Sequence, residues 1–286
     1  MDVGEGTLSI GGEPGRPLRV AAIGSDGPHH HHLYSVLGRR FELVGVIVEQ
    51  GDRWGLGLLR KRRYVDWFYL RVHERRQRLL GHRRYRRGFF AALGPDLPPA
   101  TVVRARSVND PEVPAALTAW APDITIVFAV SILRADVLAA AGTSINVHAG
   151  CLPAYRGNQG VFMALHRRDE ANVGASLHLV VPKVDAGPLL AVIHSPVHPD
   201  DNEETLWCRS IQRAIRELTD LLARLEAGDS IPYRGQPSGA PAIRNRDRGF
   251  TTDLISAWRR LRGHRLRARP HWIIEHGDCT RTTTAE

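Results

Sequence analysis

Short apolar runs separated by segments of helical periodicity constrain the fold of this chain more than any other feature. The clearest runs cover residues 18–24, 42–49, 123–129 and 143–147. The last two are apolar almost throughout rather than alternating, which indicates strands buried on both faces of a sheet. Such strands alternating with helices are typical of an α/β domain. We therefore expect a mostly parallel central sheet flanked by helices.

Changes in composition divide the chain into three parts. A Gly-rich N-terminus at 1–16 is expected to be flexible, a main domain is expected at 17–235, and a polar, basic and irregular tail at 236–286. Inside the main domain, a basic segment at about 52–98 mixes Arg and aromatic residues with roughly helical spacing, which indicates a helical insertion.

The net charge of +9 is concentrated in that insertion. Residues 60–87 hold twelve Lys and Arg against Asp66 and Glu74. Three interpretations of this segment stay open. The first is contact with RNA or a phosphate-rich substrate, since Arg with interleaved aromatic residues suits both. The second is contact with an anionic membrane surface, and the third is an insertion that packs its Trp and Tyr on the domain with its Arg side chains facing outward.

The N-terminus has no basic start followed by an apolar stretch, so no secretion signal is expected. The longest apolar run, 124–133, is about half of a membrane span. The three Cys are widely spaced at positions 151, 208 and 279, and they match no metal-binding motif. We therefore expect a cytoplasmic protein with no membrane span and no metal site.

Polar residues gather where apolar strands end. Asn146 and His148 lie two residues apart at the end of the strand expected at 143–147, so their side chains share one face. Asp185 follows the strand expected at 174–181, and His178 lies within that strand. Ligands of open α/β sheets bind beyond the carboxyl ends of the strands. We expect these side chains to meet in that crevice.

The residues around these positions resemble a known family. The stretch "INVHAGCLPAYRG", followed by "GASLHLVVPKVDAGPLL", is similar to the folate-dependent formyltransferases, which act on glycinamide ribonucleotide, methionyl-tRNA or amino sugars. Their pattern is Asn-x-His, a Leu-Pro-x-x-x-Gly loop, and a later Asp followed by x-Gly. The resemblance implies a Rossmann-like formyltransferase fold over roughly residues 18–230. It also implies Asn146, His148 and Asp185 as catalytic residues, with His178 supporting them.

The resemblance further implies a one-carbon transferase with 10-formyltetrahydrofolate as formyl donor. Asn146 and a protonated His148 are expected to donate hydrogen bonds to the formyl oxygen, and one such donor is worth roughly 10²–10³ in rate. Asp185, with His148 or through a water, is expected to transfer the proton. Its carboxylate is expected to raise the pKa of His148, so that this ring is cationic near neutral pH.

Two groups of binding residues follow from the same resemblance. The apolar slot for the folate is expected to be formed by Ser131, Ile132, Leu133, Leu138 and Val184. Contacts to the amine substrate are expected from Gly24, Ser25, His29, Arg156 and Gly157. The run His29–His32 is either a helix start that faces an anionic substrate or merely a polar helix start. Cys151 lies in the same loop, but acyl transfer through a thiol is not the family's route.

These observations favour formylation of an anionic small-molecule amine, such as an amino sugar nucleotide or a biosynthetic intermediate. Methionyl-tRNA formylation is an alternative, although too few residues follow the long helix expected at 204–228 for the further domain of that branch. Hydrolysis of the formyl-folate is another. A basic RNA-binding protein on an idle scaffold is the non-enzyme alternative, and the intact Asn, His and Asp set argues against it. Nucleic acid binding through 60–87 is therefore not favoured.

Overall fold

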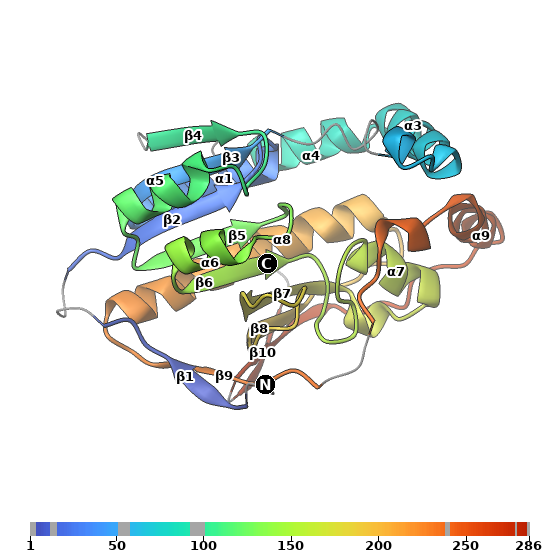
Figure 1. Cartoon of the computed structure of the whole chain (residues 1–286). Helices are drawn as coiled ribbons and strands as arrows, with labels where there is room; N and C mark the ends of the chain where they lie inside the picture. The colour runs from blue at the N-terminus through green and yellow to red at the C-terminus, as the bar shows by residue number, and fades with distance from the viewer. Residues whose placement is uncertain are drawn as a thin grey trace.

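A nine-stranded sheet forms the centre of the computed structural model (Figure 1). The structure describes residues 4–11, 16–50, 58–91, 101–237, 241–277 and 279–284. Within them the strand order is β11-β10-β8-β7-β6-β5-β2-β3-β4. The parallel strands are β4 (Thr101–Ala105), β3 (Glu42–Glu49), β2 (Arg19–Gly24), β5 (Ile124–Phe128) and β6 (Ser144–His148). The predicted α/β fold with a mostly parallel central sheet is confirmed, with an antiparallel extension.

The antiparallel extension begins next to β6. Its strands are β7 (Gly174–Leu179), β8 (Leu189–His194), β10 (His271–His276) and β11 (Thr280–Thr284). In the pairing of β6 with β7, Asn146 lies directly opposite His178. Residues directly opposite on antiparallel strands have neighbouring side chains. The register of this pair therefore brings two of the expected site residues together.

The order of the parallel strands creates a crevice. From β2 the chain builds outward to β3 and β4, and it then returns to the other side of β2 for β5 and β6. The direction of growth thus reverses between β2 and β5. Such a switch point, at the carboxyl ends of the strands, is where open α/β sheets bind ligands. The loops that follow β5 and β6 lie on this side.

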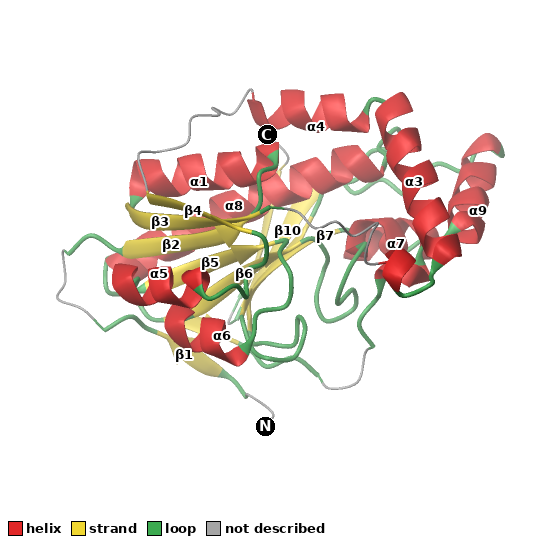
Figure 2. Cartoon of the chain, turned by 45° about the horizontal axis from the view of Figure 1, so that its top comes forward, coloured by secondary structure: helices red, strands yellow, loops and turns green. Residues whose placement is uncertain are grey.

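Helices cover both faces of the sheet (Figure 2). One face is covered by α1 (Pro28–Arg40) and α8 (Glu203–Glu226), and their apolar side chains share one buried cluster with β2, β5 and β6. The other face is covered by α5 (Glu112–Trp120) and α6 (Ala135–Ala141), which form a second cluster. The sheet is therefore enclosed on both sides, as its apolar strands require.

The long helix α8 shows how local sequence sets these elements. The Asn202 side chain caps its start by accepting N–H groups of Glu204 and Thr205, at 2.8 and 3.1 Å. One stripe of the helix then faces the sheet, because its Leu and Ile recur with helical spacing. Ile211, Leu218, Leu222 and Leu225 are at most 3% exposed. Burial of each such side chain contributes about 1.5–3 kcal/mol.

The described part of the basic insertion forms two helices. They are α3 (Tyr64–Leu79) and α4 (His82–Ala91). Phe90 of α4 is buried against α1, and Arg86 forms two hydrogen bonds with Glu204 of α8, at 2.6 and 2.8 Å. In contrast, α3 has no buried residue. Parts of the expected insertion, at 52–57 and 92–98, lie outside the described residues.

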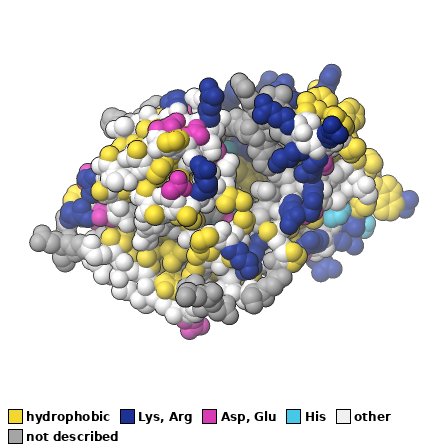
Figure 3. All heavy atoms as spheres, viewed as in Figure 1, with side chains coloured by type: hydrophobic (Ala, Val, Ile, Leu, Met, Phe, Trp, Pro, Cys, Tyr) yellow, Lys and Arg dark blue, Asp and Glu magenta, His cyan; other side chains and the backbone are white. Residues whose placement is uncertain are grey.

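The aromatic residues of the insertion follow only in part the interpretation in which its Trp and Tyr pack on the domain. Trp67 and Tyr69 of α3 are half-buried, whereas Tyr64 and Tyr85 are exposed. In Figure 3, Lys and Arg side chains gather on the side of the molecule formed by α3 and α9 (Phe250–Leu261), with apolar side chains between them. None of the described helices is long and apolar enough to cross a membrane.

Both chain ends depart from the expectations. Residues Gly6–Leu8, expected to be flexible, form β1, which pairs with β9 (Ile231–Tyr233). The tail, expected to be irregular, contains the helix α9 and the hairpin of β10 and β11. Because β10 pairs with β8, the tail extends the central sheet. Trp272 and Ile274 of β10 join the core cluster, which supplies the apolar burial that holds this hairpin in place.

Candidate functional site

The predicted catalytic residues come together at the carboxyl end of β6. The amide nitrogen Nδ2 of Asn146 lies 3.4 Å from Oδ1 of Asp185. Nδ1 of His148 lies 3.4 Å from Oδ2 of the same carboxylate. Asp185 follows β7 in a turn where its own φ is +46°, a left-handed conformation that non-glycine residues adopt rarely. Backbone strain of this kind often marks a functional position.

The hydrogen bonds of His178 fix its ring and orient Asn146. Its Nδ1 lies 2.8 Å from the carbonyl oxygen of Leu179, which can only accept, so Nδ1 carries the hydrogen. The other ring nitrogen, Nε2, then accepts from Nδ2 of Asn146 at 3.0 Å. This contact assigns the amide orientation of Asn146. The expected supporting position of His178 agrees with this geometry.

His148 is buried, and its two ring nitrogens face different partners. Nε2 lies 2.8 Å from the carbonyl oxygen of Tyr155, so this nitrogen donates. Nδ1 of the neutral ring therefore carries a lone pair and points toward the Asp185 carboxylate. A proton taken up at Nδ1 would be stabilised at once by that carboxylate. The geometry favours a proton acceptor at this position.

The expectation of a cationic His148 is wrong. Burial is the largest influence and lowers the pKa of His148 below its usual value of 6.5. The Asp185 carboxylate and the Tyr155 carbonyl raise this pKa, as expected, but they do not offset the loss of solvent. The neighbouring carboxylate, taken alone, would raise the pKa of this ring. With desolvation included, the ring is neutral at neutral pH.

Asp185 is ionised in this environment. Burial acts to raise its pKa, but His148, His178 and the backbone N–H of Gly157 outweigh it and lower the pKa to about 2. The N–H of Gly157 donates to Oδ2 at 2.8 Å. The charges of His148 and His178 act on Asp185 only where those rings are protonated, whereas the Gly157 N–H donates to the carboxylate at any pH.

Gly157 itself is required by its surroundings. Its φ is +83°, and a Cβ atom there would lie 2.2 Å from the carbonyl oxygen of Ile243. The close approach forms a bridge in which the N–H of Asn158 donates to the Ile243 carbonyl at 2.8 Å. The loop after β6 is thereby tied to the segment before α9.

A cavity of about 810 Å³ opens beside these residues. Asn146, His148 and Asp185 all line it. Gly157 lines the cavity as well. So do all five residues that were expected to form the apolar slot, namely Ser131, Ile132, Leu133, Leu138 and Val184. The volume falls within the range of about 300–1,000 Å³ that is usual for small-molecule sites. The cavity is lined by many apolar side chains together with a smaller set of polar ones.

Glu49, at the end of β3, holds the wall of this cavity. Its Oε2 accepts the backbone N–H of Ser131 at 3.0 Å, and its Oε1 accepts that of Val108 at 3.2 Å. The side chain of Asn109 donates to the Ile132 carbonyl at 2.9 Å. These contacts position the 131–133 backbone. Nothing in the local sequence distinguishes Glu49, because its partners are distant in the chain.

Several residues expected to contact the substrate lie elsewhere. Arg156 is 3% exposed, and its guanidinium donates to Gln236 at 3.0 and 3.2 Å, so it joins two loops rather than facing the cavity. Ser25 donates to the Glu49 carbonyl at 3.1 Å, and neither Ser25 nor Gly24 lines the cavity. Gln236, which sequence reasoning missed, also donates to the Asp185 carbonyl at 3.0 Å.

The histidine run at the start of α1 is mostly buried. His29, His30 and His32 are at most 9% exposed, and His29 packs against Phe128 and Trp207. Burial lowers the pKa of His29 well below 6.5, and it lowers those of His30 and His32 to about 4. The expectation that this helix start faces an anionic substrate does not fit, because neutral buried rings supply no positive charge.

The thiol of Cys151 is 1% exposed and lies 3.8 Å from the Ile193 carbonyl. Burial raises its pKa well above the usual range. Nucleophilic thiolates need partial exposure and a lowered pKa. The structure therefore agrees with the expectation that Cys151 is no nucleophile. Among the described residues, no group of three or more His, Cys, Asp or Glu is arranged to hold a metal ion.

Known proteins share this architecture. The chain resembles solved structures of a phosphoribosylglycinamide formyltransferase from Anaplasma phagocytophilum and a 4-N formyltransferase from Francisella tularensis. The first has a TM-score of 0.52 at 16% identity and covers 80% of this chain and 98% of its own. The second has a TM-score of 0.52 at 10% identity and covers 83% of this chain and 85% of its own. At these identities the likeness shows the fold.

Sequence relatives and a family model narrow the assignment. A methionyl-tRNA formyltransferase of Rhodopirellula baltica is 36% identical over 136 residues, which are 46% of this chain and 40% of that protein. One from Synechococcus is 33% identical over 167 residues, 53% and 52% of the two chains. The chain thus matches about half the length of these relatives or less. A formyl transferase model matches residues 71–219, more than half of the sequence. The chain belongs to the formyl transferase family.

Proposed function

We propose that this protein transfers a formyl group from 10-formyltetrahydrofolate to the amine of a small molecule, such as an amino sugar nucleotide or a biosynthetic intermediate. One observation carries the proposal. Asn146, His148 and Asp185 meet in the lining of a cavity of about 810 Å³. Family membership supports the reaction class.

The cavity suits the proposed donor. The parts of its wall formed by Val130–Leu133, Val180–Pro182 and Val184 are largely apolar, as the ring system of a folate requires. Ile132 and Val184 are exposed at 67% and 38% although both line the cavity. Exposed apolar side chains in a concave site are typical of ligand contacts. 10-Formyltetrahydrofolate supplies the formyl carbon, carried on its N10 atom.

Proton transfer falls to His148 in this mechanism. The amine nitrogen forms a bond to the formyl carbon while the bond from that carbon to N10 breaks. The proton lost by the amine moves to Nδ1 of His148, whose lone pair faces Asp185. The imidazolium then forms an ion pair with Asp185, and the ring returns the proton toward N10. A positioned acid–base group contributes roughly 10²–10⁴ in rate.

Asn146 stabilises the charge that develops on the formyl oxygen. One of its N–H groups is held by His178 at 3.0 Å. The other makes only a long contact of 3.4 Å with Asp185, so it stays available to a formyl oxygen that lies along its direction. A single donor of this kind contributes roughly 10²–10³ in rate. His178 thus acts through Asn146, which it positions.

A second candidate is the formylation of methionyl-tRNA. The curated relatives from Rhodopirellula and Synechococcus carry that name, although each match covers about half of the relative or less. The exposed Arg side chains of α3 and α4 supply positive charge for a nucleic acid backbone. The same catalytic residues would serve either acceptor.

One assay separates these functions. The protein is incubated with 10-formyltetrahydrofolate and, in parallel, with amino sugar nucleotides, with methionyl-tRNA or with no acceptor, and release of tetrahydrofolate is followed. We expect release that depends on a small-molecule amine, with the formylated amine detected by mass. Formylmethionyl-tRNA would assign the second candidate. Release without acceptor would assign hydrolysis, and no release in any arm would contradict formyl transfer.

A further inference from the structure

The helix α9 lies on the protein with its polar side inward. Asp253 is 8% exposed and accepts a hydrogen bond from the Tyr69 hydroxyl at 3.0 Å. The Ser256 hydroxyl lies 3.0 Å from Nδ1 of His166, and the Arg259 guanidinium donates to the His166 carbonyl at 2.6 Å. A helix at the surface of a globular protein normally buries its apolar stripe and exposes its polar side. The orientation of α9 is the reverse.

The apolar stripe of α9 faces outward instead. Leu254, Trp258 and Leu261 recur at helical spacing, so they share one face of the helix. They are 68%, 53% and 88% exposed. Single apolar side chains are common on protein surfaces, whereas a contiguous exposed patch of large ones marks a surface that binds a protein or a membrane. We therefore expect another surface to cover this side of α9.

A second exposed apolar stripe runs along α3, which lies beside α9 (Figures 1 and 2). Val65, Phe68, Val72 and Leu79 recur at helical spacing, and all four are exposed. The ring centres of Phe68 and Phe250 lie 5.9 Å apart, so the stripe of α3 meets that of α9 where α9 begins. We refer to the two stripes together as the α3–α9 face.

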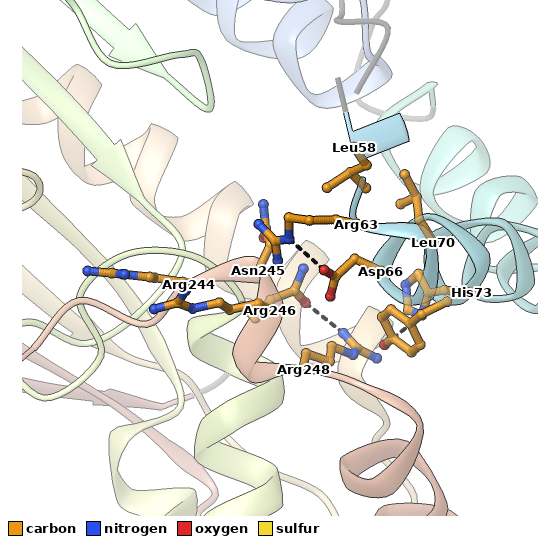
Figure 4. Close-up of a pocket in the computed structure, with 11 residues that line it drawn as sticks. Leu58, Arg63, Asp66, Leu70, His73, Arg244, Asn245, Arg246 and Arg248 are labelled. Carbon is orange, nitrogen blue, oxygen red and sulfur yellow. Dashed lines mark hydrogen bonds and ion pairs between the residues drawn. The ribbon is translucent and has the colours of Figure 1, made fainter. Parts of the chain in front are cut away.

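The inward side of α3 is occupied by other contacts. Together with residues 244–248, it borders a second cavity, of about 480 Å³. In Figure 4 the side chains of Asp66 and His73 extend from α3 toward that segment. The Asp66 carboxylate accepts from Arg63 at 2.6 Å, and Nδ1 of His73 lies 3.7 Å from the Asp253 carboxylate. No residue of the α3–α9 face lines this cavity, so the outward stripe of α3 is separate from it.

The α3–α9 face is surrounded by positive charge. Both carboxylates of α3 are paired, Asp66 with Arg63 at 2.6 Å and Glu74 with Arg71 at 3.1 Å. The only carboxylate of α9 is that of Asp253, which is buried. Figure 3 shows Lys and Arg side chains around the apolar ones on this side of the molecule. Exposed arginines on the two helices and just after α9 include Arg75, Arg78, Arg260, Arg262 and Arg265.

This charge indicates which kind of partner fits the α3–α9 face. If two copies of the chain paired through it, their arginines would meet, and like charges across an interface repel. A nucleic acid supplies negative charge, but the aliphatic side chains of Val65, Leu254 and Leu261 cannot stack on bases as aromatic rings do. The observations therefore favour a partner that combines negative charge with an apolar layer.

An anionic phospholipid bilayer has both properties. Its phosphates lie at the surface, and the apolar acyl chains begin just below them. The guanidinium of Arg262 lies 4.6 Å from the centre of the Trp258 ring, so a cation stands directly beside the apolar stripe. Tryptophan is enriched at the boundary between headgroups and acyl chains, and Arg side chains can reach from that depth to the phosphates.

We propose that the α3–α9 face binds the surface of an anionic phospholipid bilayer, with both helices lying in the plane of that surface. The apolar side chains enter the headgroup boundary, and the arginines contact lipid phosphates. This corresponds to the second interpretation of the basic insertion, and it adds α9 to the binding surface. The proposal does not depend on formyl transfer, because no residue of the face lines the catalytic cavity.

Co-sedimentation of the full chain with phospholipid vesicles tests the proposal. One set of vesicles contains equimolar phosphatidylglycerol and phosphatidylcholine, and the other contains phosphatidylcholine alone. We expect the wild type to bind the anionic vesicles at least about tenfold more tightly than the neutral ones. The double variant Leu254→Ser/Leu261→Ser keeps every charge but loses apolar contact, so it should bind the anionic vesicles at least about tenfold more weakly than the wild type.

A second pair of variants tests the contribution of charge. Arg75→Ala/Arg78→Ala should weaken binding to the anionic vesicles at least about threefold. The matched control, Arg39→Ala/Arg40→Ala, removes two exposed charges at the end of α1 and should bind as the wild type does. Melting temperatures equal to that of the wild type show that the variants fold.

Several results would overturn the proposal. These are absence of binding to anionic vesicles, wild-type binding by Leu254→Ser/Leu261→Ser, and equal weakening in both arginine pairs. Without vesicle binding, a dimer in sedimentation velocity that Leu254→Ser/Leu261→Ser abolishes would assign the face to a second copy of the chain. Binding of bulk tRNA that the same variant abolishes, again without vesicle binding, would assign the face to a nucleic acid.

Discussion

Nδ1 of His148 lies 3.4 Å from Oδ2 of Asp185, while Nε2 of the same ring lies 2.8 Å from the Tyr155 carbonyl. The carbonyl fixes the hydrogen on Nε2, so the lone pair of the ring faces the carboxylate. This relationship makes His148 a base that becomes part of an ion pair once it is protonated. The predictions on catalysis follow from it.

Replacement of His148 by alanine should lower turnover by roughly 10²–10⁴, because the proton acceptor is lost. Asp185→Asn should also lower turnover, since the imidazolium loses its counter-charge. Binding of a stable folate analogue should change little in His148→Ala. The matched control is His271→Ala, which removes an exposed histidine at the start of β10. Turnover like that of the wild type in His148→Ala would contradict the mechanism.

The pH dependence of kcat/KM should show a base with a lowered pKa. Burial lowers the pKa of His148 below 6.5, so the ring is neutral and active at neutral pH. The rate should be level near neutral pH and should fall as the pH drops through the lowered pKa. A profile recorded from about pH 5 to about pH 8 checks this. A rate that falls as the pH rises toward 8 would instead indicate that the protonated form of His148 is the active one.

Glu49 should control folate binding without touching the reacting atoms. In Glu49→Ala, the buried N–H of Val108 loses its acceptor, at a cost of about 1–3 kcal/mol, and the N–H of Ser131, in a part-buried bond, loses its acceptor too. We expect a lower melting temperature and weaker binding of the folate analogue. Glu42→Ala is the matched control, because Glu42 is exposed at the start of β3. Unchanged analogue binding in Glu49→Ala would show that the 131–133 backbone does not form the site.

The buried histidines of α1 should make the fold sensitive to acid. The pKa of His32 is about 4 in the folded state and 6.5 when unfolded, so the unfolded chain binds more protons between these values. This ring's contribution to stability is therefore fully present above pH 6.5 and is lost as the pH falls toward 4. At pH 5 the loss amounts to about 2 kcal/mol, given 1.36 kcal/mol per pKa unit.

Urea unfolding at about pH 7.5 and about pH 5 measures this effect. The variant His32→Leu should lose about 2 kcal/mol less stability between the two conditions than the wild type does. The control His271→Leu removes an exposed histidine and should behave as the wild type. An equal loss in His32→Leu and the wild type would show that His32 does not titrate in this range.

Local patterns were sufficient to predict the parallel strands and the meeting of Asn146, His148 and Asp185. Apolar runs identify buried strands, and the position of polar residues at strand ends places them in the crevice. The role of His271–His276 as a central-sheet strand could not be predicted, because its partner β8 is distant in sequence. Trp272 and Ile274 of this strand are buried, but the strand has polar ends and lies in a segment rich in Arg, so the sequence gives no clear apolar pattern there.

The charge state of His148 could not be predicted from the sequence either. The neighbouring carboxylate was visible as Asp185, but the burial that outweighs it depends on how the loop after β6 folds over the ring. The same holds for the run His29–His32, which looks polar in sequence. Phe90, Phe128 and Trp207 come from distant elements and enclose these rings. Gln236, which donates to the Asp185 carbonyl, and Arg244, which lines the cavity, likewise carry no local signal in the sequence.

Binding of a stable 10-formyltetrahydrofolate analogue, measured by calorimetry, tests the central claim most directly. Ile132→Asp places a charge on the cavity wall at a residue that is 67% exposed, so the fold should tolerate it. Leu79→Asp makes the same change on α3, where Leu79 is 79% exposed and lines neither cavity. The account predicts binding in the micromolar range to the wild type and to Leu79→Asp, and none to Ile132→Asp. Absence of binding to the wild type at high protein concentration would contradict it.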